Sequence, residues 1–278
     1  MAITNFIPEI WSSKMLVEFQ NTAVWAGLAN REYEGDLRSG NTLHITSPVP
    51  ITIKDYKANN RTTTADDIQD TGLDILVDQE KNFDFYVDDI DRAQAAGNLG
   101  EYTKSAADGL VQDSDKFLAA LAVTNGTAVT PGAQATDAKT AWNVLRDLRK
   151  ALNKAAVPFE NRVFVANAEF EALLFEHDSK MTNADQSGTT DGLRNASLGN
   201  ILRLEGYASE NLPQTDVPQV VAMHRSALAY VSQIQKTEGM RAENKFADRL
   251  RGLHVYGGKV VRPKAIAVYT GADAGTGA

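Results

Sequence analysis

One long helical pattern constrains this chain more than any other feature. Between Asp91 and Thr124, apolar residues recur at steps of three, four or seven, so they line one face of a helix. Asp115 falls elsewhere on the helical wheel, and Asn125-Gly126 is a usual C-terminal stop. The predicted helix is about 50 Å long, whereas the usual globular helix has about 11–12 residues. It is therefore either a strut or an ordinary long core helix.

The start of this helix is weaker than its end. Aspartates from Asp88 to Asp91 crowd the predicted start, where carboxylates cap free amides. Gly97 and Gly100 weaken the first turns, so the firm part is expected from about Leu99. The apolar stripe consists of Leu99, Tyr102, Ala106, Leu110, Phe117 and Leu121.

Composition excludes several classes of protein. The chain has 278 residues, of which 43% are hydrophobic and 23% charged, as in globular proteins with a core. The absence of cysteine excludes disulfides, zinc–thiolate sites and thiol catalysis. The sequence has neither an apolar run of about 18 residues, which a membrane span needs, nor a signal-peptide pattern at Met1. We therefore expect a soluble protein, without a membrane partner, that stays in the cell that made it.

Charge is distributed unevenly along the chain. The net charge of −8 argues against a general nucleic-acid binder. Residues 66–91 carry ten acids and one base, whereas residues 225–264 carry nine bases and three acids. These stretches are either two solvated faces or complementary surfaces through which copies meet head to tail.

Alternating apolar residues predict strands on both sides of a polar stretch. The period of two runs from Leu43 to Ile53, and again through residues 73–77 and 83–87. Pro48 and other prolines in the first run indicate an edge strand, and residues 55–72 are a polar tip. Because an isolated hairpin is marginal in water, its apolar face is expected on another subunit. The alternative is a strand pair of an ordinary sheet.

Residues 1–40 are interpreted as an N-terminal arm. A helical apolar stripe includes Trp11 and Phe19, and a second short stripe includes Trp25 and Leu28. Two tryptophans this close to a terminus need cover, which either the same chain or a neighbour supplies.

Strands and helices interleave in the second half. After a turn-rich linker at 125–136, Asp137 and Asn167 are expected to cap two helices, with a buried strand at 163–166 between them. Short strands are expected at 201–204, 220–223 and 228–231, and two more around a turn at Gly257-Gly258. This order predicts a mixed α/β or α+β domain.

No constellation for catalysis emerges. The four histidines lack metal-ligand spacing, and neither a phosphate-binding loop nor a nucleophile elbow is present. Capping and surface charge explain the aspartates around Asp84 and Asp88, which lack calcium-loop spacing. We expect no catalytic, cofactor or metal residues, and a structural role rather than an enzyme. An enzyme whose acids converge in the α/β domain stays the contrary hypothesis.

The order of the parts resembles the major capsid protein of tailed bacteriophages, with its Hong Kong 97-type fold. Residues 74–91 look like the return arm of that family's extended loop, and 158–174 like the strand and helix of its axial domain. Residues 206–213, Gly-Tyr-Ala-Ser-Glu-Asn-Leu-Pro, are similar to a run common in the family, with Ala208 where valine is frequent. Residues 248–263 resemble its peripheral strands.

The resemblance implies an α+β capsid fold in six parts. Its core parts are a long spine helix at 91–124 and an axial α/β domain. The expected parts are an N-terminal arm (1–40), an extended β-hairpin loop (41–88), a peripheral domain with the spine helix (89–135), the axial domain (136–245), returning peripheral-domain strands (246–270) and a flexible tail (271–278).

The resemblance also implies a function. Copies would form pentamers and hexamers that close into an icosahedral head around double-stranded DNA, with a portal and decoration proteins as further partners. Because the arm reaches the extended loop by residue 41, the scaffolding protein is expected to be separate. The protein would reside in the virion after assembly in the host bacterial cytoplasm. The alternative is an encapsulin-type compartment shell.

Charge and apolar exposure single out candidates for subunit contacts. They are Trp11, Phe19, Trp25, Tyr56, Lys57, Arg61, Asp84, Asp88, Arg249, Arg251, Lys259 and Arg262.

Overall fold

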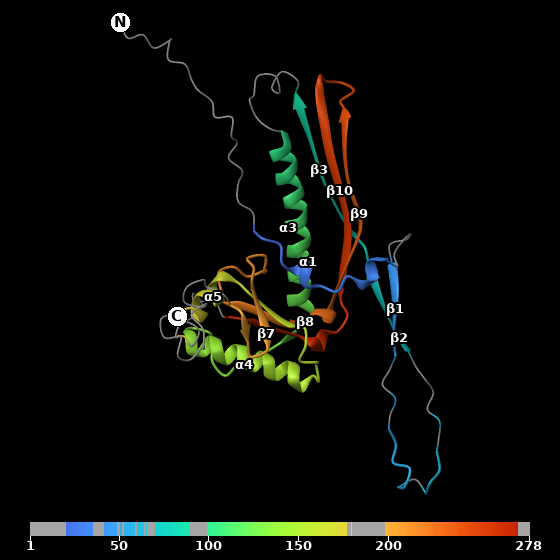
Figure 1. Ribbon diagram of the computed structural model, residues 1–278, viewed down its shortest axis with the longest axis vertical. Coiled ribbons are helices and arrows are strands. Elements are labelled where there is room, and N and C mark those ends of the chain that lie inside the picture. Colours follow the sequence, from blue (N-terminus) through green and yellow to red (C-terminus); the bar gives the residue numbers. More distant parts are fainter. Residues whose placement is uncertain are drawn as a thin grey trace, which may run out of the picture.

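Three parts make up the molecule: an α/β body, a tall three-stranded sheet and a projecting hairpin (Figure 1). This is a computed structural model, and it describes residues 21–35, 42–48, 51, 53–58, 60–63, 65, 70–88, 99–176, 179 and 198–271. The predicted helix around Trp11 and Phe19, the start of the spine helix at 91–98 and the tail after residue 271 lie outside these residues.

The α/β body is built on a six-stranded sheet in the order β4-β11-β8-β5-β7-β6. Its strands are β4 (Thr127–Ala128), β5 (Arg162–Ala166), β6 (Asn200–Ile201), β7 (Leu204–Ala208), β8 (Gln219–His224) and β11 (Ile266–Thr270). Short 3-10 turns, η2 (Arg225–Ala227) and η3 (Pro263–Ala265), follow β8 and precede β11. Because β4 lies in the predicted linker, that segment is part of the sheet.

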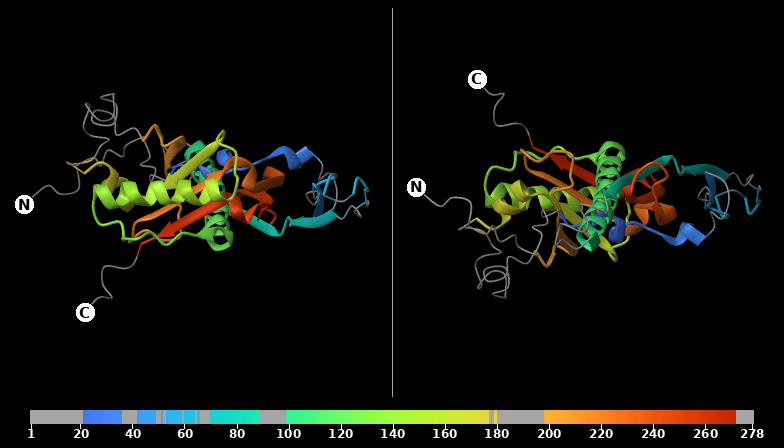
Figure 2. Two further views of the ribbon diagram at one scale, coloured as in Figure 1. Left: turned by 90° about the horizontal axis from the view of Figure 1, so that it is seen from below. Right: turned by 90° about the horizontal axis from the view of Figure 1, so that it is seen from above.

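Helices cover both faces of this sheet. Because alternate residues of a strand point to opposite faces, each central strand contributes side chains to both layers. On one face, Phe164 packs in a core with α4 (Ala138–Lys154) and α5 (Ala168–Leu174). Figure 2 shows α4 lying across that face when the molecule is seen from below. On the other face, Val163 and Val165 pack with Leu118 of the long helix. Every residue of β5 is therefore buried.

Both predicted caps in the α/β body are confirmed. The Asp137 carboxylate accepts a hydrogen bond from Thr140 N at 2.7 Å, and the Thr140 hydroxyl accepts one from Asp137 N, which completes a capping box. The Asn167 side chain accepts hydrogen bonds from Phe170 N and Gln219 N, so it caps α5 and holds β8.

The strand predicted at 201–204 is wrong. Leu202 and Arg203 both adopt positive φ, at 53° and 62°, and form a two-residue turn between β6 and β7. Turns of this kind usually carry Asn-Gly, because a β-carbon disfavours that conformation. Neither residue is a turn former, so no local signal in the sequence indicates the reversal.

The spine helix α3 (Leu99–Asn125) ends where predicted and is described from Leu99 onward. Phe117, a member of the predicted stripe, packs against the tall sheet, where it meets Tyr256 edge-on with ring centroids 5.6 Å apart. A second side of the helix, which includes Leu118 and Asp115, is fully buried. Asp115 lies off the predicted stripe and is nevertheless buried, because groups from other elements surround it.

The three-stranded sheet has the order β3-β10-β9 and is antiparallel throughout. It comprises β3 (Gln79–Asp88), β9 (Leu228–Arg241) and β10 (Ala247–Val260). The predicted turn at Gly257-Gly258 is wrong, since β10 runs straight through both glycines. A β-carbon at Gly257 would collide with the Leu76 carbonyl oxygen, and one at Gly258 would lie 2.9 Å from Leu118. These glycines permit close packing rather than a reversal.

The extended hairpin consists of β1 (Thr42–Pro48) paired antiparallel with β2 (Asp70–Leu76). The first strand ends at Pro48, earlier than the predicted Ile53, consistent with the missing proline N–H groups. At its root, Ile75 and Val77 pack against β9 and β10. Although predicted as part of this loop, residues 79–88 pair with β10 instead.

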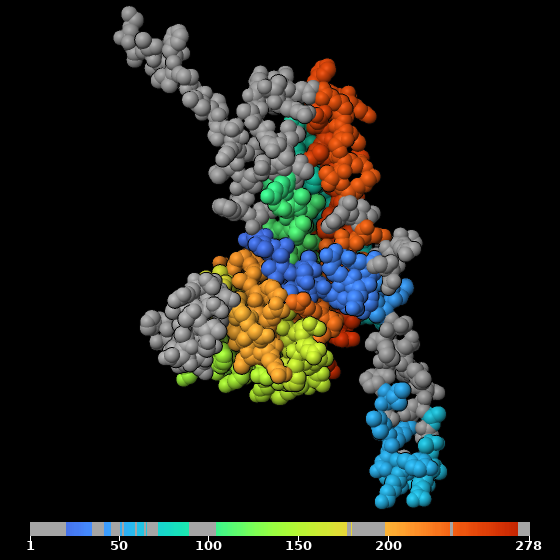
Figure 3. All heavy atoms as spheres, viewed as in Figure 1, coloured from blue at the N-terminus to red at the C-terminus, as the bar shows by residue number. Residues whose placement is uncertain are grey.

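A strap, residues 21–35, crosses the junction between the two sheets (Figures 1 and 3). It contains α1 (Trp25–Leu28) and the 3-10 turn η1 (Glu32–Gly35). Asn30 bridges to β9 through its backbone, with Asn30 N donating to Leu228 O at 2.8 Å. Trp25 is fully buried in the chain's own core, so for this tryptophan the cover comes from the same chain.

Candidate assembly surfaces

The projecting hairpin exposes apolar side chains beyond its paired strands. Ile51 is 74% exposed and Ile53 is 97% exposed. Tyr56 is also exposed, and Figure 3 shows this end of the hairpin standing clear of the body. Isolated apolar residues are common on surfaces, and here two exposed isoleucines lie close together on one projecting segment.

The tip of the hairpin is shaped by local hydrogen bonds. The Asp55 carboxylate accepts from Lys57 N at 2.9 Å, and Arg61 N donates to Tyr56 O at 3.0 Å. Asn60 and Arg61 both have positive φ. The candidates Tyr56, Lys57 and Arg61 therefore lie together at the exposed tip, within the predicted polar stretch at 55–72.

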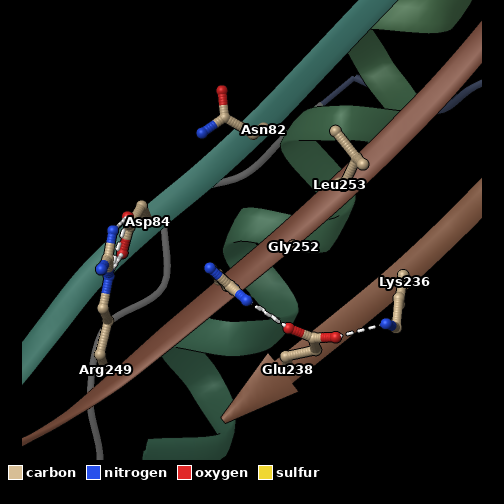
Figure 4. A pocket seen from close by; sticks show the side chains of 8 residues that line it. Asn82, Asp84, Lys236, Glu238, Arg249, Gly252 and Leu253 are labelled. Atoms are coloured by element: carbon tan, nitrogen blue, oxygen red, sulfur yellow. Dashed lines mark hydrogen bonds and ion pairs between the residues drawn. The ribbon is translucent and has the colours of Figure 1, made fainter. Parts of the chain in front are cut away.

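The outward face of the three-stranded sheet carries a ladder of ion pairs (Figure 4). The Arg249 guanidinium binds both carboxylate oxygens of Asp84, with Nε to Oδ1 at 2.9 Å. This contact holds the pKa of Asp84 below its ordinary value. Arg249 also lies over the Tyr86 ring, at 5.5 Å from its centroid. The Arg249 side chain thus contacts both Asp84 and Tyr86, which lie on β3.

A second ion pair continues this ladder on β9. The Glu238 carboxylate accepts hydrogen bonds from Lys236 and from Arg251, the latter with Nη2 to Oε2 at 2.6 Å. These two contacts lower the pKa of Glu238 to about 2. The ladder surrounds a shallow hollow of about 440 Å³ that Asn82 and Leu253 help to line.

The acidic and basic stretches therefore meet within one chain. Strands β3 and β10 are antiparallel neighbours, so Asp84 of the acidic stretch faces Arg249 and Arg251 of the basic stretch. The charges of these three candidates are thus paired within one subunit, without the head-to-tail contact between copies that their sequence allowed. Asp88 lies opposite Ala247 at the end of β3.

The remaining charged candidates are also engaged inside the subunit. Lys259 donates from Nζ to the Asp74 carbonyl oxygen at 2.7 Å, next to the root of the hairpin. Arg262 donates from Nη1 to Ser226 Oγ at 3.1 Å. The structure thus brings most candidates to two surfaces, the hairpin tip and the sheet face. It places Trp25 in the core, which corrects its choice as an interface residue.

The described residues do not gather into a metal site. In the part of the chain that the structure describes, no three metal-ligating side chains gather at one point. No described helix is long and apolar enough to span a bilayer.

Asp115 and Asn211 form a buried polar contact that the sequence analysis missed. Both are buried, on α3 and in the loop after β7 respectively, and they bind each other. The only available signal was the position of Asn211 in the family-like run at 206–213.

Comparison with known proteins agrees with this architecture. The family model for the phage capsid protein matches residues 72–269. A structure from Mycobacterium phage Che8 is 51% identical, with a TM-score of 0.90, over 96% of this chain and 98% of that one. No curated protein matches the sequence.

More distant structures share the fold. The capsid structure of cyanophage P-SCSP1u is 15% identical, with a TM-score of 0.82, over 99% of this chain and 95% of that one. The mature capsid of bacteriophage PhiM1 is 14% identical, with a TM-score of 0.72, over 95% and 92%. The α+β capsid fold predicted from the sequence is confirmed. The chain therefore belongs to the phage capsid protein family, and it is a major capsid protein.

Proposed function

We propose that copies of this chain form hexamers and pentamers that close into an icosahedral head around double-stranded DNA. The observation that carries the proposal is the projecting hairpin, whose Ile51 and Ile53 are exposed in the single subunit. Burial of such side chains against a neighbour supplies hydrophobic stabilisation that the isolated chain lacks. Repeated contacts of one kind between copies generate closed rings.

The further partners follow from the same proposal. A separate scaffolding protein and a portal guide assembly in the host bacterial cytoplasm, and decoration proteins bind the finished shell. The net charge of −8 is compatible with this role, because a shell need not grip its DNA tightly. The role is structural rather than enzymatic.

Electron microscopy tests the proposal directly. The protein is purified alone and after co-expression with the neighbouring phage genes, and both samples are studied by negative stain and sedimentation. We expect closed particles in the second sample, and nuclease-protected DNA in particles made with the packaging genes. Monomer alone in both samples would contradict the proposal. Closed particles that enclose protein cargo instead of DNA would favour the encapsulin-type alternative.

A further inference from the structure

A buried carboxylate lies where the strap crosses the spine helix. Asp115 is 0% exposed. Its Oδ1 accepts hydrogen bonds from the backbone N–H groups of Trp25, at 2.6 Å, and Ala26, at 3.2 Å. Its Oδ2 accepts one from the side-chain amide of Asn211 at 2.8 Å. The three donors are neutral, and they come from two parts of the chain that are far from Asp115 in sequence.

The hydrogen bond between Asp115 and Asn211 compensates for the burial of both side chains. A buried carboxylate is costly unless hydrogen bonds replace its water. Asn211 is itself 3% exposed, and its amide also lies 3.5 Å from the Thr22 carbonyl oxygen. Asp115 and Asn211 therefore hold the beginning of the strap from two sides, one from α3 and one from the α/β body.

The strap continues from this point to the tall sheet. Tyr230 N donates to Asn30 O at 3.0 Å, and Ser232 N donates to the Glu34 carboxylate at 3.2 Å. Figure 3 shows the strap crossing from the α/β body to the side of the three-stranded sheet. Since residues 1–20 directly precede the strap in the sequence, its beginning is the point at which they join the described fold.

We propose that Asp115 and Asn211 form a buckle that fixes the root of the N-terminal arm on the spine helix. Closure of the buckle fixes the beginning of the strap against the body, and shell assembly depends on it. The second statement rests on the proposed function, whereas the first concerns the single subunit. Both residues act by positioning the strap.

An exchange of the two side chains tests the buckle. Asn211→Asp replaces the amide donor with a second carboxyl group against Asp115, so the pair must either hold two like charges or take up a proton, and both cost free energy. The double variant Asp115→Asn/Asn211→Asp restores one donor and one acceptor, and the new amide oxygen on α3 can still accept from the backbone N–H groups of the strap. Asn125→Asp, at the exposed end of the same helix, adds the same charge elsewhere and serves as the control.

Trp25 reports the state of the strap without any need for assembly. In a Trp11→Phe/Trp142→Phe background, Trp25 is the remaining tryptophan, and its indole is fully buried in the parent chain. We expect a red-shifted emission for Asn211→Asp, and the parental emission for the double variant and the control. Parental emission for Asn211→Asp would overturn the buckle. If that variant fails to fold by circular dichroism, Asn211→Ala removes the donor without adding a charge, and the same criterion applies.

Shell formation tests whether assembly depends on the position of the strap. We expect a large loss of closed particles for Asn211→Asp, and recovery in the double variant. Normal shells from a variant whose Trp25 is red-shifted would overturn the dependence of assembly on the buckle. A parent chain that never assembles would contradict the proposed function, whereas the emission experiment would still decide whether the buckle exists.

Discussion

The α/β body and the outlying elements differ in how completely they bury their apolar residues. Every residue of β5 is buried, whereas β3 alternates between half-buried and exposed positions. Among the described residues, eight of the ten large apolar side chains that are exposed lie in the hairpin, the three-stranded sheet or the turn that joins β9 to β10. They are Ile51, Ile53, Tyr56, Leu76, Tyr86, Met240, Phe246 and Leu253.

This difference separates stability from assembly. The α/β body is closed on itself, because helices cover both faces of its sheet. The hairpin and the outward sheet face keep apolar groups in water, and the proposed contacts between copies would cover them. Substitutions in the first region should therefore affect folding, and those in the second should affect contacts between copies.

The largest expected effect on folding is in the α/β core. Phe164→Ala should lower the free energy of unfolding by about 3–5 kcal/mol, because the ring is fully buried between β5 and the helices. Phe246→Ala makes the same change at a side chain that is 83% exposed, and should alter stability by less than about 0.5 kcal/mol. Urea unfolding measures the free energy of unfolding of both variants. Equal losses would contradict the difference between the α/β body and the outlying elements.

A smaller effect is expected where the tall sheet meets the hairpin root. Gly257→Ala should destabilise the fold by about 1–3 kcal/mol, because the new methyl group collides with the Leu76 backbone. Gly239→Ala is the matched control in the same sheet, since its β-carbon would meet Leu250 at an ordinary 3.6 Å. Thermal unfolding compares them, and a neutral Gly257→Ala would show that this contact is looser than described.

The ion-pair ladder should give a still smaller, pH-dependent effect. The pKa of Glu238 is lowered from 4.5 to about 2, so its pairing stabilises the fold above its ordinary pKa. This contribution should disappear as pH falls from about 4.5 towards 2, when the carboxylate is protonated in both states. Glu238→Gln lacks the charge at every pH.

Urea midpoints measured between pH 6 and pH 2.5 test this effect. The difference between the parent and Glu238→Gln should narrow towards the acid end. Glu243→Gln, in the turn between β9 and β10, is the control. A difference that stays constant with pH would contradict a role for the Glu238 charge.

Local signals in the sequence predicted local structure well. The caps at Asp137 and Asn167 were predictable because a side chain and the amides it binds lie within three residues. The end of α3 at Asn125 followed from a glycine directly after it. The family-like order of the parts then indicated the fold class.

Features that depend on distant neighbours were not predictable. Gly257-Gly258 has the composition of a turn, but the approach of Leu76 and Leu118 requires glycine within a continuous strand. Asp115 has the position of a surface residue on the helical wheel, but the strap covers it. In each case, the missing information was the identity of the residues packed against the site.

The pairing of the charged stretches was likewise not predictable from the sequence. The acidic and basic stretches were recognisable in the sequence, but their pairing within one chain depends on β3 lying beside β10. Residue composition indicates that two stretches are complementary, and only the sheet order indicates that they belong to the same copy.

The most direct test of the account uses Ile51→Asp/Ile53→Asp, because this change should have the smallest effect on folding and a large effect on assembly. The side chains are 74% and 97% exposed, so the free energy of unfolding should change by less than about 0.5 kcal/mol. Closed particles should be absent by negative-stain microscopy under conditions in which the parent forms them. Normal particles, or a loss of stability as large as that of Phe164→Ala, would contradict the central claim that the hairpin serves assembly and not folding.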